Sequence, residues 1–303
     1  MFNKNTEENP FEKNPFGESP FDDDELFFEE EMEIMEEEKE DATLKRNIAY
    51  VSDMRWSVTS VSSFLNCNYY FALHYIDKLP TADNFFAQFG RVVHEILEDY
   101  WHGSILSFQM ADAFLKKYQK TVTLPPPGFM KNVNDSYVGK ITEYFKTFDR
   151  ELSDIEMLSS EKAIESTYMG YPIIIIPDFL FKNENGSTVL MDFKTSTPFY
   201  KTGTPNKKKM QPYERQLQIY AYFVQKELGI KIDVCKILFP RAEGREYGVN
   251  ISENKIQESL DWLQNGIEKI MDTDTFEPNT SDKFFCQNLC SQRDNCPFWK
   301  EVA

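Results

Sequence analysis

The chain has 303 residues, of which 41% are hydrophobic and 15% aromatic, so it can bury a full core. This composition excludes a peptide hormone, a small disulfide scaffold and a collagen-like fibre. The formal net charge is -17, but residues 1–41 hold 17 acidic residues against 3 lysines, whereas residues 42–303 hold 33 acidic and 30 basic residues. Because the body is nearly neutral, the overall acidity does not exclude an anionic partner.

No stretch approaches the roughly 18 consecutive apolar residues of a membrane span, and the N-terminus lacks the basic and then apolar segment of a secretory signal. We therefore expect a cytoplasmic protein without a membrane partner, from a bacterium or a phage-infected cell. Three of the five cysteines lie within residues 286–296. This crowding favours metal binding in a reduced compartment over a disulfide framework.

Residues 1–46 are predicted to form a disordered acidic tail. A five-residue pattern built on Pro-Phe occurs three times, at 9–13, 14–18 and 19–23, and a run rich in Asp and Glu follows. Proline at this density prevents a regular helix, and like charges repel in a compact form. Two interpretations remain open: a solvated tail, or a segment whose Phe side chains bind a basic protein partner or a groove of the protein itself.

The predicted globular domain spans residues 47–303 and begins with helices. Four are expected, over residues 57–76, 85–101, 108–121 and 135–151. The first carries Cys67 on its apolar stripe, and the i, i+4 spacing of the second places His94 and Glu98 on one face. The last two lie in a helical insertion at about 103–158.

Strands dominate the next part of the domain. Three are expected within residues 160–195, joined by turns at 169–170 and 183–186, and two more near 232–240 and 246–251. Helices are expected over 212–228 and 253–271, before a Cys-rich end at 276–303. This order predicts a mixed α/β fold, with a small mixed sheet flanked by helices.

The hairpin predicted around the turn at 183–186 brings acidic residues together. Paired positions in an antiparallel hairpin lie symmetrically about the turn, so Asp178 should face Asp192. Side chains alternate along a strand, so Lys194 should share the face of Asp192. Two facing carboxylates repel unless one binds a proton or a divalent cation lies between them. Mg²⁺ prefers oxygen ligands, so the arrangement indicates metal-assisted phosphodiester hydrolysis.

These residues resemble a known signature. Pro177-Asp178 followed by Asp192-x-Lys194 is similar to the motif of the PD-(D/E)XK nuclease superfamily. A histidine motif at 90–94, a Q-x-x-x-Y motif from Gln216 to Tyr220 and four cysteines narrow the resemblance to RecB/Cas4-like exonucleases of the AddB/Dna2 type. The resemblance covers about residues 57–299. It implies a restriction-endonuclease-like core with an N-terminal helical region and a C-terminal cysteine-cluster staple.

The resemblance also implies roles for individual residues. The Mg²⁺ or Mn²⁺ ligands would be His94, Asp178, Asp192 and the Phe193 carbonyl. Lys194 would act on the attacking water, and Gln216 and Tyr220 would contact the DNA strand.

Three glutamates and three lysines are weaker candidates. Glu98 lies near His94 on its helix, and a turn at 169–170 places Glu161 opposite Asp178 with Glu165 on the same face. One of these glutamates supports the site in our interpretation. Three consecutive lysines, expected in the loop 195–211, either hold a phosphate or only add solubility. They are Lys207, Lys208 and Lys209.

The C-terminal cysteines Cys286, Cys290 and Cys296 are dense enough to hold one ion or cluster, which needs a fourth thiolate. Cys67 is the expected fourth ligand, because Cys235 lies in an apolar strand, where cysteine is usually a small buried hydrophobe. The resemblance favours a structural [4Fe–4S] cluster, with Zn²⁺ as the alternative.

The sequence as a whole predicts a Mg²⁺- or Mn²⁺-dependent DNA exonuclease acting on single-stranded DNA or DNA ends, in recombination, repair or replication. The alternative is a catalytically silent subunit that keeps the nuclease fold and binds DNA ends, or acts as a scaffold, without cutting its DNA partner. A third possibility is an adaptor whose working part is the tail. We expect the enzyme, because Asp178, Asp192, Lys194 and His94 are all present.

Overall fold

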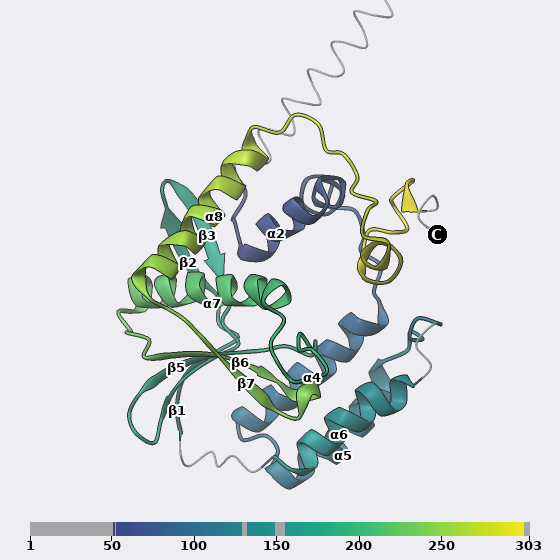
Figure 1. The fold of residues 1–303 in the computed structure, drawn as a ribbon, viewed down its shortest axis with the longest axis vertical. Helices are drawn as coiled ribbons and strands as arrows, with labels where there is room; N and C mark the ends of the chain where they lie inside the picture. The colour runs from purple at the N-terminus through teal and green to yellow at the C-terminus, as the bar shows by residue number, and fades with distance from the viewer. Residues whose placement is uncertain (1–50, 52, 129–131, 149–154, 300–303) are drawn as a thin grey trace, which may run out of the picture. The chain divides into compact units, whose positions relative to one another are not determined.

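The computed structural model describes residues 51, 53–128, 132–148 and 155–299. The predicted tail, residues 1–46, lies outside these residues. Among the described residues, no helix combines the length and the apolarity needed to cross a membrane. The described chain is a mixed α/β fold in which one five-stranded sheet lies between helices, as the sequence predicts (Figure 1).

Helices form the first part of the fold. They are α2 (Val58–Asn66), α3 (Asn68–Phe71), a π-helical turn (Ala72–Ile76), α4 (Phe85–Trp101), a 3-10 turn (Ser107–Gln109), α5 (Met110–Thr121), a second π-helical turn (Asn134–Gly139) and α6 (Lys140–Lys146). The bounds of α4 agree with the prediction. The first predicted helix is broken, because Cys67 has an extended backbone (φ -157°) and ends α2 while its sulfur accepts the N–H of Tyr70 to cap α3.

Strands and two long helices form the rest. They are β1 (Ile155–Ser160), β2 (Ile164–Tyr168), β3 (Tyr171–Ile175), β4 (Phe179–Asn183), β5 (Thr188–Phe193), α7 (Lys207–Leu228), β6 (Val234–Phe239), a 3-10 turn (Pro240–Ala242), β7 (Arg245–Val249), α8 (Glu253–Met271) and a π-helical turn (Phe285–Leu289). The strand order in the large sheet is β1-β4-β5-β6-β7, and β2 and β3 form a separate hairpin. Only β5 and β6 run parallel within the large sheet, and α7 forms the crossover between them.

Three predicted boundaries were wrong. The middle strand of the predicted three is divided into β3 and β4, because Pro177 has no N–H to continue a ladder and the two halves pair with different partners. The expected insertion at 103–158 ends in a strand, since Ile155–Ser160 pairs with β4. Finally, α7 begins at Lys207 rather than at Pro212, because the Asn206 side chain accepts the N–H of Lys209 and caps an earlier start.

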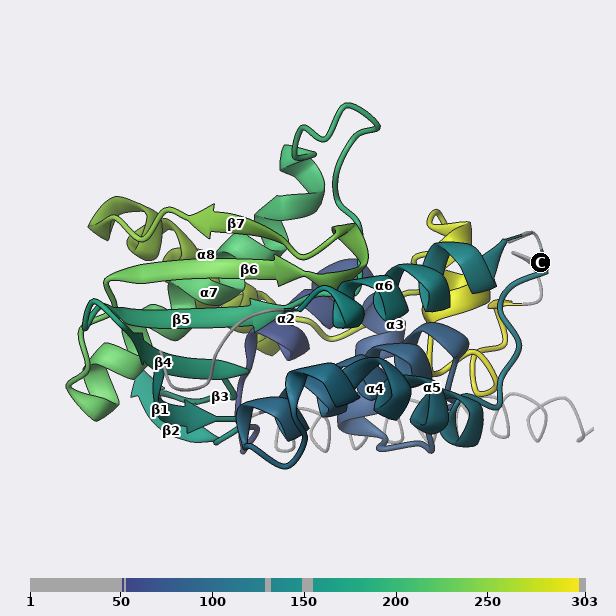
Figure 2. The same ribbon diagram turned by 90° about the horizontal axis from the view of Figure 1, so that it is seen from below.

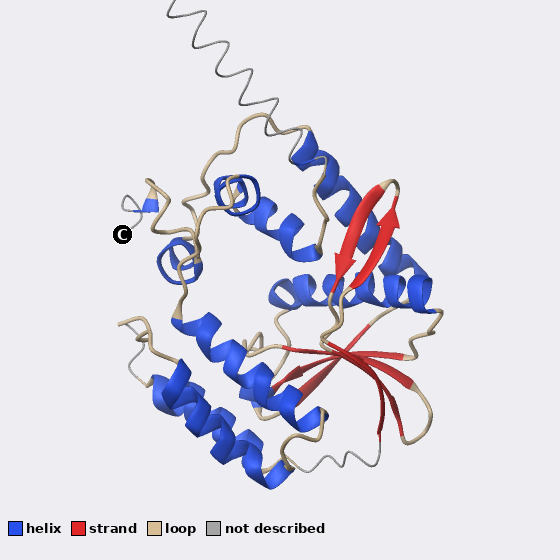
Figure 3. Cartoon of the chain, turned by 180° about the vertical axis from the view of Figure 1, so that it is seen from behind, coloured by secondary structure: helices blue, strands red, loops and turns tan. Residues whose placement is uncertain are grey.

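The large sheet carries a helical layer on each face (Figures 2 and 3). Odd-numbered residues of β4 and β5, such as Phe179 and Met191, pack in one buried cluster with α4, α5 and α6. Even-numbered residues of the same strands, such as Leu190, point to the opposite face, where α7 packs. The six residues of β5 are all buried, so the site that follows β5 is held by the rigid centre of the fold.

The contact between α2 and α8 predicts a mutational effect. A Cβ atom added at Gly266 of α8 would lie 2.3 Å from Cγ1 of Val61 on α2. Overpacking of this kind costs about 1–3 kcal/mol, which exceeds the gain of about 1 kcal/mol that alanine offers over glycine in a helix. We expect Gly266→Ala to lower the free energy of unfolding in denaturant titrations. Val61→Ala should relieve the clash, so the two effects should not add; additive losses would contradict this account.

Candidate active site

The β4–β5 hairpin has the register that the sequence predicts. Phe179 pairs with Met191, so Asp178 stands opposite Asp192 at the open end of the hairpin. The left-handed turn at the other end is made by Gly186 (φ 76°). Lys194 shares the face of Asp192, and its Nζ lies 2.6 Å from Asp192 Oδ2.

Both aspartates are held in a poorly hydrated environment. The side chains of Asp178 and Asp192 are 12% and 2% exposed. Burial raises the pKa of Asp178, whose Oδ2 accepts the backbone N–H of Phe193 at 2.7 Å. Burial raises the pKa of Asp192 to about 6, against the lowering effect of Lys194. Burial also opposes the charge of Lys194, but the two aspartates outweigh it and hold the pKa of Lys194 above its ordinary value, so this lysine is protonated at neutral pH.

His94 approaches the aspartates from α4. Its Nδ1 lies 3.8 Å from Asp178 Oδ2, and its ring meets the Phe193 ring edge-on with centroids 6.1 Å apart. Burial and the positive charge of Lys194 lower the pKa of His94. The imidazole is therefore neutral at pH 7, which is the form that binds a metal ion.

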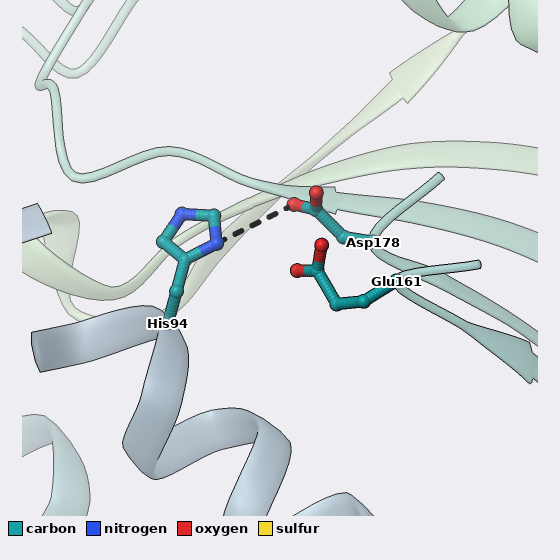
Figure 4. Close-up of side chains that lie close together, drawn as sticks. All are labelled: His94, Glu161 and Asp178. Carbon is teal, nitrogen blue, oxygen red and sulfur yellow. Dashed lines mark ion pairs between the residues drawn. The ribbon is translucent and has the colours of Figure 1, made fainter. Parts of the chain in front are cut away.

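Glu161 completes a group of three possible ligands. Its backbone N–H donates to the carbonyls of Pro177 and Asp178 at 3.1 and 3.2 Å, in a left-handed conformation (φ 48°). Burial and the neighbouring Asp178 raise the pKa of Glu161 to about 7. Ligand atoms of His94, Glu161 and Asp178 all lie within 4.8 Å of one another (Figure 4), and no other described residues form such a group of three.

The donor set fits a divalent cation. Three carboxylates and a neutral imidazole converge, and burial keeps two of the carboxylates from being stabilised by water. Asp192 Oδ1 is buried without any hydrogen-bond donor, which is costly unless a cation is bound. Of the expected ligands, His94 and Asp178 are in the group of three, whereas Asp192 is beside it and paired with Lys194. The backbone N–H of Phe193, whose carbonyl is the fourth expected ligand, donates to Asp178 Oδ2.

The other predicted site residues fall into two sets. Gln216 and Tyr220 lie on α7, where Gln216 Nε2 donates to Tyr220 Oη at 3.1 Å. Tyr220 is only 7% exposed and lies close enough to Asp192 and Lys194 for their charges to affect its pKa. It is therefore a buried neighbour of the site. Tyr213 lies two turns before Tyr220 on α7 and was not predicted from the sequence as a site residue, although its ring lies 5.6 Å from Lys194 Nζ. The seven-residue spacing places both tyrosines on one face of the helix, and this spacing could have identified Tyr213.

Of the weaker candidates, some lie near the site and others do not. Glu98 lies one turn after His94, and its charge opposes the lowering of the His94 pKa. Glu165 forms an exposed ion pair with Arg55 at 2.6 Å and is not in the metal-binding group. The three lysines are not in a loop as predicted but in the first turn of α7, and only Lys209 lines a hollow next to the site.

The four expected cysteines line one hollow at the C-terminal end of the described chain: Cys67, Cys286, Cys290 and Cys296. Burial, together with the other thiols, raises the pKa of Cys290 to about 11 and also raises the pKa of Cys286. Cys235 is isolated in β6, where burial raises its pKa to about 12. The structure thus brings together the cysteines that the sequence grouped, and the donor set of four thiols fits either a [4Fe–4S] cluster or Zn²⁺.

Comparison with known proteins agrees with this geometry. The sequence model of the PD-(D/E)XK nuclease superfamily matches residues 55–297. The chain belongs to this superfamily. Its five-stranded sheet flanked by helices is accordingly the restriction-endonuclease-like core expected above. No curated protein matches the chain significantly.

Two solved structures resemble the chain. One is a protein from Eubacterium rectale described as a "putative exonuclease", with 16% identity, a TM-score of 0.45, and coverage of 82% of this chain and 89% of that one. The other is the protein SSO0001, with 15% identity, a TM-score of 0.36, and coverage of 87% and 96%.

The raised pKa of Glu161 predicts how stability changes with pH. The unfolded carboxyl has a pKa near 4.5, so the folded protein without metal binds this proton more tightly. The resulting contribution to stability is full below about pH 4.5 and is lost as the pH rises through about 7. We expect the melting temperature of the metal-free protein to fall more between pH 5 and 8 than that of Glu161→Gln.

Manganese provides the complementary measurement. At pH 8, Mn²⁺ should raise the melting temperature of the wild type and raise that of Glu161→Gln much less, because one ligand is lost. Glu165→Gln is the matched control, since Glu165 lies four residues away in an exposed ion pair. An equal response of the two variants would show that Glu161 is not a ligand.

Proposed function

We propose that this nuclease is a Mg²⁺- or Mn²⁺-dependent deoxyribonuclease, acting as an exonuclease on single-stranded DNA or DNA ends. The observation that carries the proposal is the convergence of His94, Glu161 and Asp178 beside the Asp192–Lys194 pair. A divalent cation held there would neutralise the carboxylates, polarise the phosphodiester and lower the pKa of the attacking water.

The residues of the chain have separate parts in this reaction. The carboxylates of Asp178 and Glu161 and the His94 nitrogen would hold the cation. Lys194 remains protonated, so its ammonium group can orient the water and stabilise the negative charge that develops on the phosphate. Asp192 fixes the position of Lys194 Nζ through their 2.6 Å ion pair, and its second oxygen, which has no hydrogen-bond donor, would be free to hold the cation.

Lys194 is the residue whose removal tests the activity. We expect Lys194→Met to lower the rate of digestion of end-labelled single-stranded DNA by about 100-fold or more, while the binding of the strand persists. Lys182→Met is the matched control, because Lys182 lies on the neighbouring strand in an exposed ion pair with Glu156. Circular single-stranded DNA should resist digestion if free ends are required.

Two outcomes would contradict the proposal. A wild-type protein that binds the strand but never cuts it would favour a silent end-binding or scaffold subunit. Equal digestion by wild type and Lys194→Met would place the chemistry elsewhere.

The cysteine hollow supports a second part of the proposal, a structural [4Fe–4S] cluster of the RecB/Cas4 type. The preference for a cluster over a single zinc ion rests on the sequence resemblance, in which one cysteine far upstream, Cys67, joins three near the C-terminus.

Iron content tests this part. We expect anaerobically purified wild type to be brown, and Cys290→Ala to lose iron, sulfide and thermal stability together, because site formation is coupled to folding of this region. Cys235→Ala should keep its iron, since Cys235 stands alone in β6. A colourless wild type that contains zinc would replace the cluster with a zinc site.

The acidic residues 1–46 lie outside the residues that the structure describes. We propose that they bind a basic protein partner or cover the protein's own DNA-binding surface, as their Pro-Phe repeats and charge suggest.

A further inference from the structure

A hollow of about 490 Å³ adjoins the active site. It begins at Thr195, the residue that follows Lys194, and its wall includes Tyr213, whose ring lies 5.6 Å from Lys194 Nζ. The Tyr213 hydroxyl donates to Ser196 Oγ at 3.0 Å, which fixes this wall. The hollow therefore lies next to Lys194, and its volume is in the range of a small-molecule site.

The lining of the hollow carries positive charge. Residues 42–303 are nearly neutral, with 33 acidic and 30 basic residues, yet the lining of the hollow contains Lys209 and Arg241 and no acidic residue. Neither cation forms an ion pair with a carboxylate of the described residues. Hydroxyl groups of Thr195, Ser196 and Thr197 also line it. Two unpaired cations with several hydroxyls suit a phosphate of a strand.

Arg241 is held in a fixed orientation. Its guanidinium stacks on the Tyr137 ring, 3.7 Å from the centroid, and one nitrogen donates to Thr197 Oγ1 at 3.0 Å. Its Nε and second terminal nitrogen are buried without an acceptor. Charged donors left unpaired in this way are costly, which is typical of a group arranged for a ligand rather than for the stability of the fold.

Aromatic side chains form the remaining wall. Phe86 of α4 and Phe284 near the cysteine hollow lie with ring centroids 6.1 Å apart, and Phe284 is 45% exposed. Cations along a backbone path, combined with aromatic rings that bases can contact, are the features by which proteins bind single strands. A base inside a duplex is stacked between its neighbours, so its faces cannot lie against such rings.

We propose that this hollow holds one unpaired nucleotide next to the bond that is cut, with its phosphate on Arg241 and Lys209 and its base against Phe86 and Phe284. The proposal rests on the proposed nuclease function and adds the selection of unpaired strands. Arg241 and Lys209 are binding residues in this arrangement, and they do not touch the metal-binding group.

The test measures binding of a labelled single-stranded oligonucleotide by the full chain without added divalent cation, so that no cutting occurs. We expect Lys209→Ala and Arg241→Gln each to weaken binding at least fivefold and to reduce the salt slope by about 0.7, the value for one phosphate contact on a single strand. Binding of a blunt duplex should change much less. Phe284→Ala should weaken strand binding about tenfold, in the range measured for lost base stacking.

Each variant has a matched control outside the hollow. Lys255→Ala changes an exposed lysine of α8, Arg245→Gln changes an arginine that stacks on Phe199, and Phe108→Ala changes a phenylalanine that is 77% exposed. These controls should bind as the wild type does. Arg241→Lys, which keeps the charge and loses the planar stack, should recover part of the affinity, and melting curves identify any variant that has lost its fold.

The outcomes separate this proposal from the proposed function. If the wild type cuts DNA while Lys209→Ala and Arg241→Gln bind strands as tightly as it does, the hollow is not a nucleotide site and the nuclease function stands. If the controls weaken binding as much as the hollow variants do, the attraction is diffuse and the proposal is wrong. If the wild type neither binds nor cuts any DNA, both proposals fail.

Discussion

Repulsion among clustered carboxylates is the constraint on which the rest of the site depends. Asp178, Asp192 and Glu161 lie together where burial penalises their charges, and Lys194 compensates for only part of that charge. The fold maintains this arrangement because the fully buried β5 leads directly into it. The repulsion lowers the stability of the metal-free protein locally.

Much of this site could be predicted from the sequence because it depends on local rules. The turn at Gly186 and strand alternation determine which residues face one another, so the opposition of Asp178 and Asp192 follows from counting. Counting from the turn at 169–170 likewise predicted Glu161 opposite Asp178, and the structure brings their carboxylates together. The position of His94 on α4 followed from helical periodicity, although its approach to the sheet did not.

The parts that were wrong or missed depend on tertiary context. Pro177 lies between β3 and β4, which belong to different sheets. The division of the predicted strand can be recognised only from the pairing of β3 with β2 and of β4 with β5. Cys67 has an extended backbone, although the apolar residues around it follow a helical pattern. Hydrophobic periodicity therefore could not predict the break between α2 and α3. Arg241 comes from a 3-10 turn after β6, and its relation to Lys194 depends on how α4, α7 and that turn pack around one hollow.

The cysteine hollow joins segments from the two ends of the described domain. Asn279 donates its side-chain N–H to Asn66 O at 2.8 Å, and Tyr69 donates its backbone N–H to Glu277 O at 3.2 Å, on either side of the thiols. The entropic cost of closing a loop grows only slowly with its length, and this junction closes a chain of more than 200 residues. It also has a mechanical consequence: a pulling force applied across residues 67 and 286 would load this junction first, and the hairpin that carries Asp178 and Asp192 would remain unstretched until the junction broke.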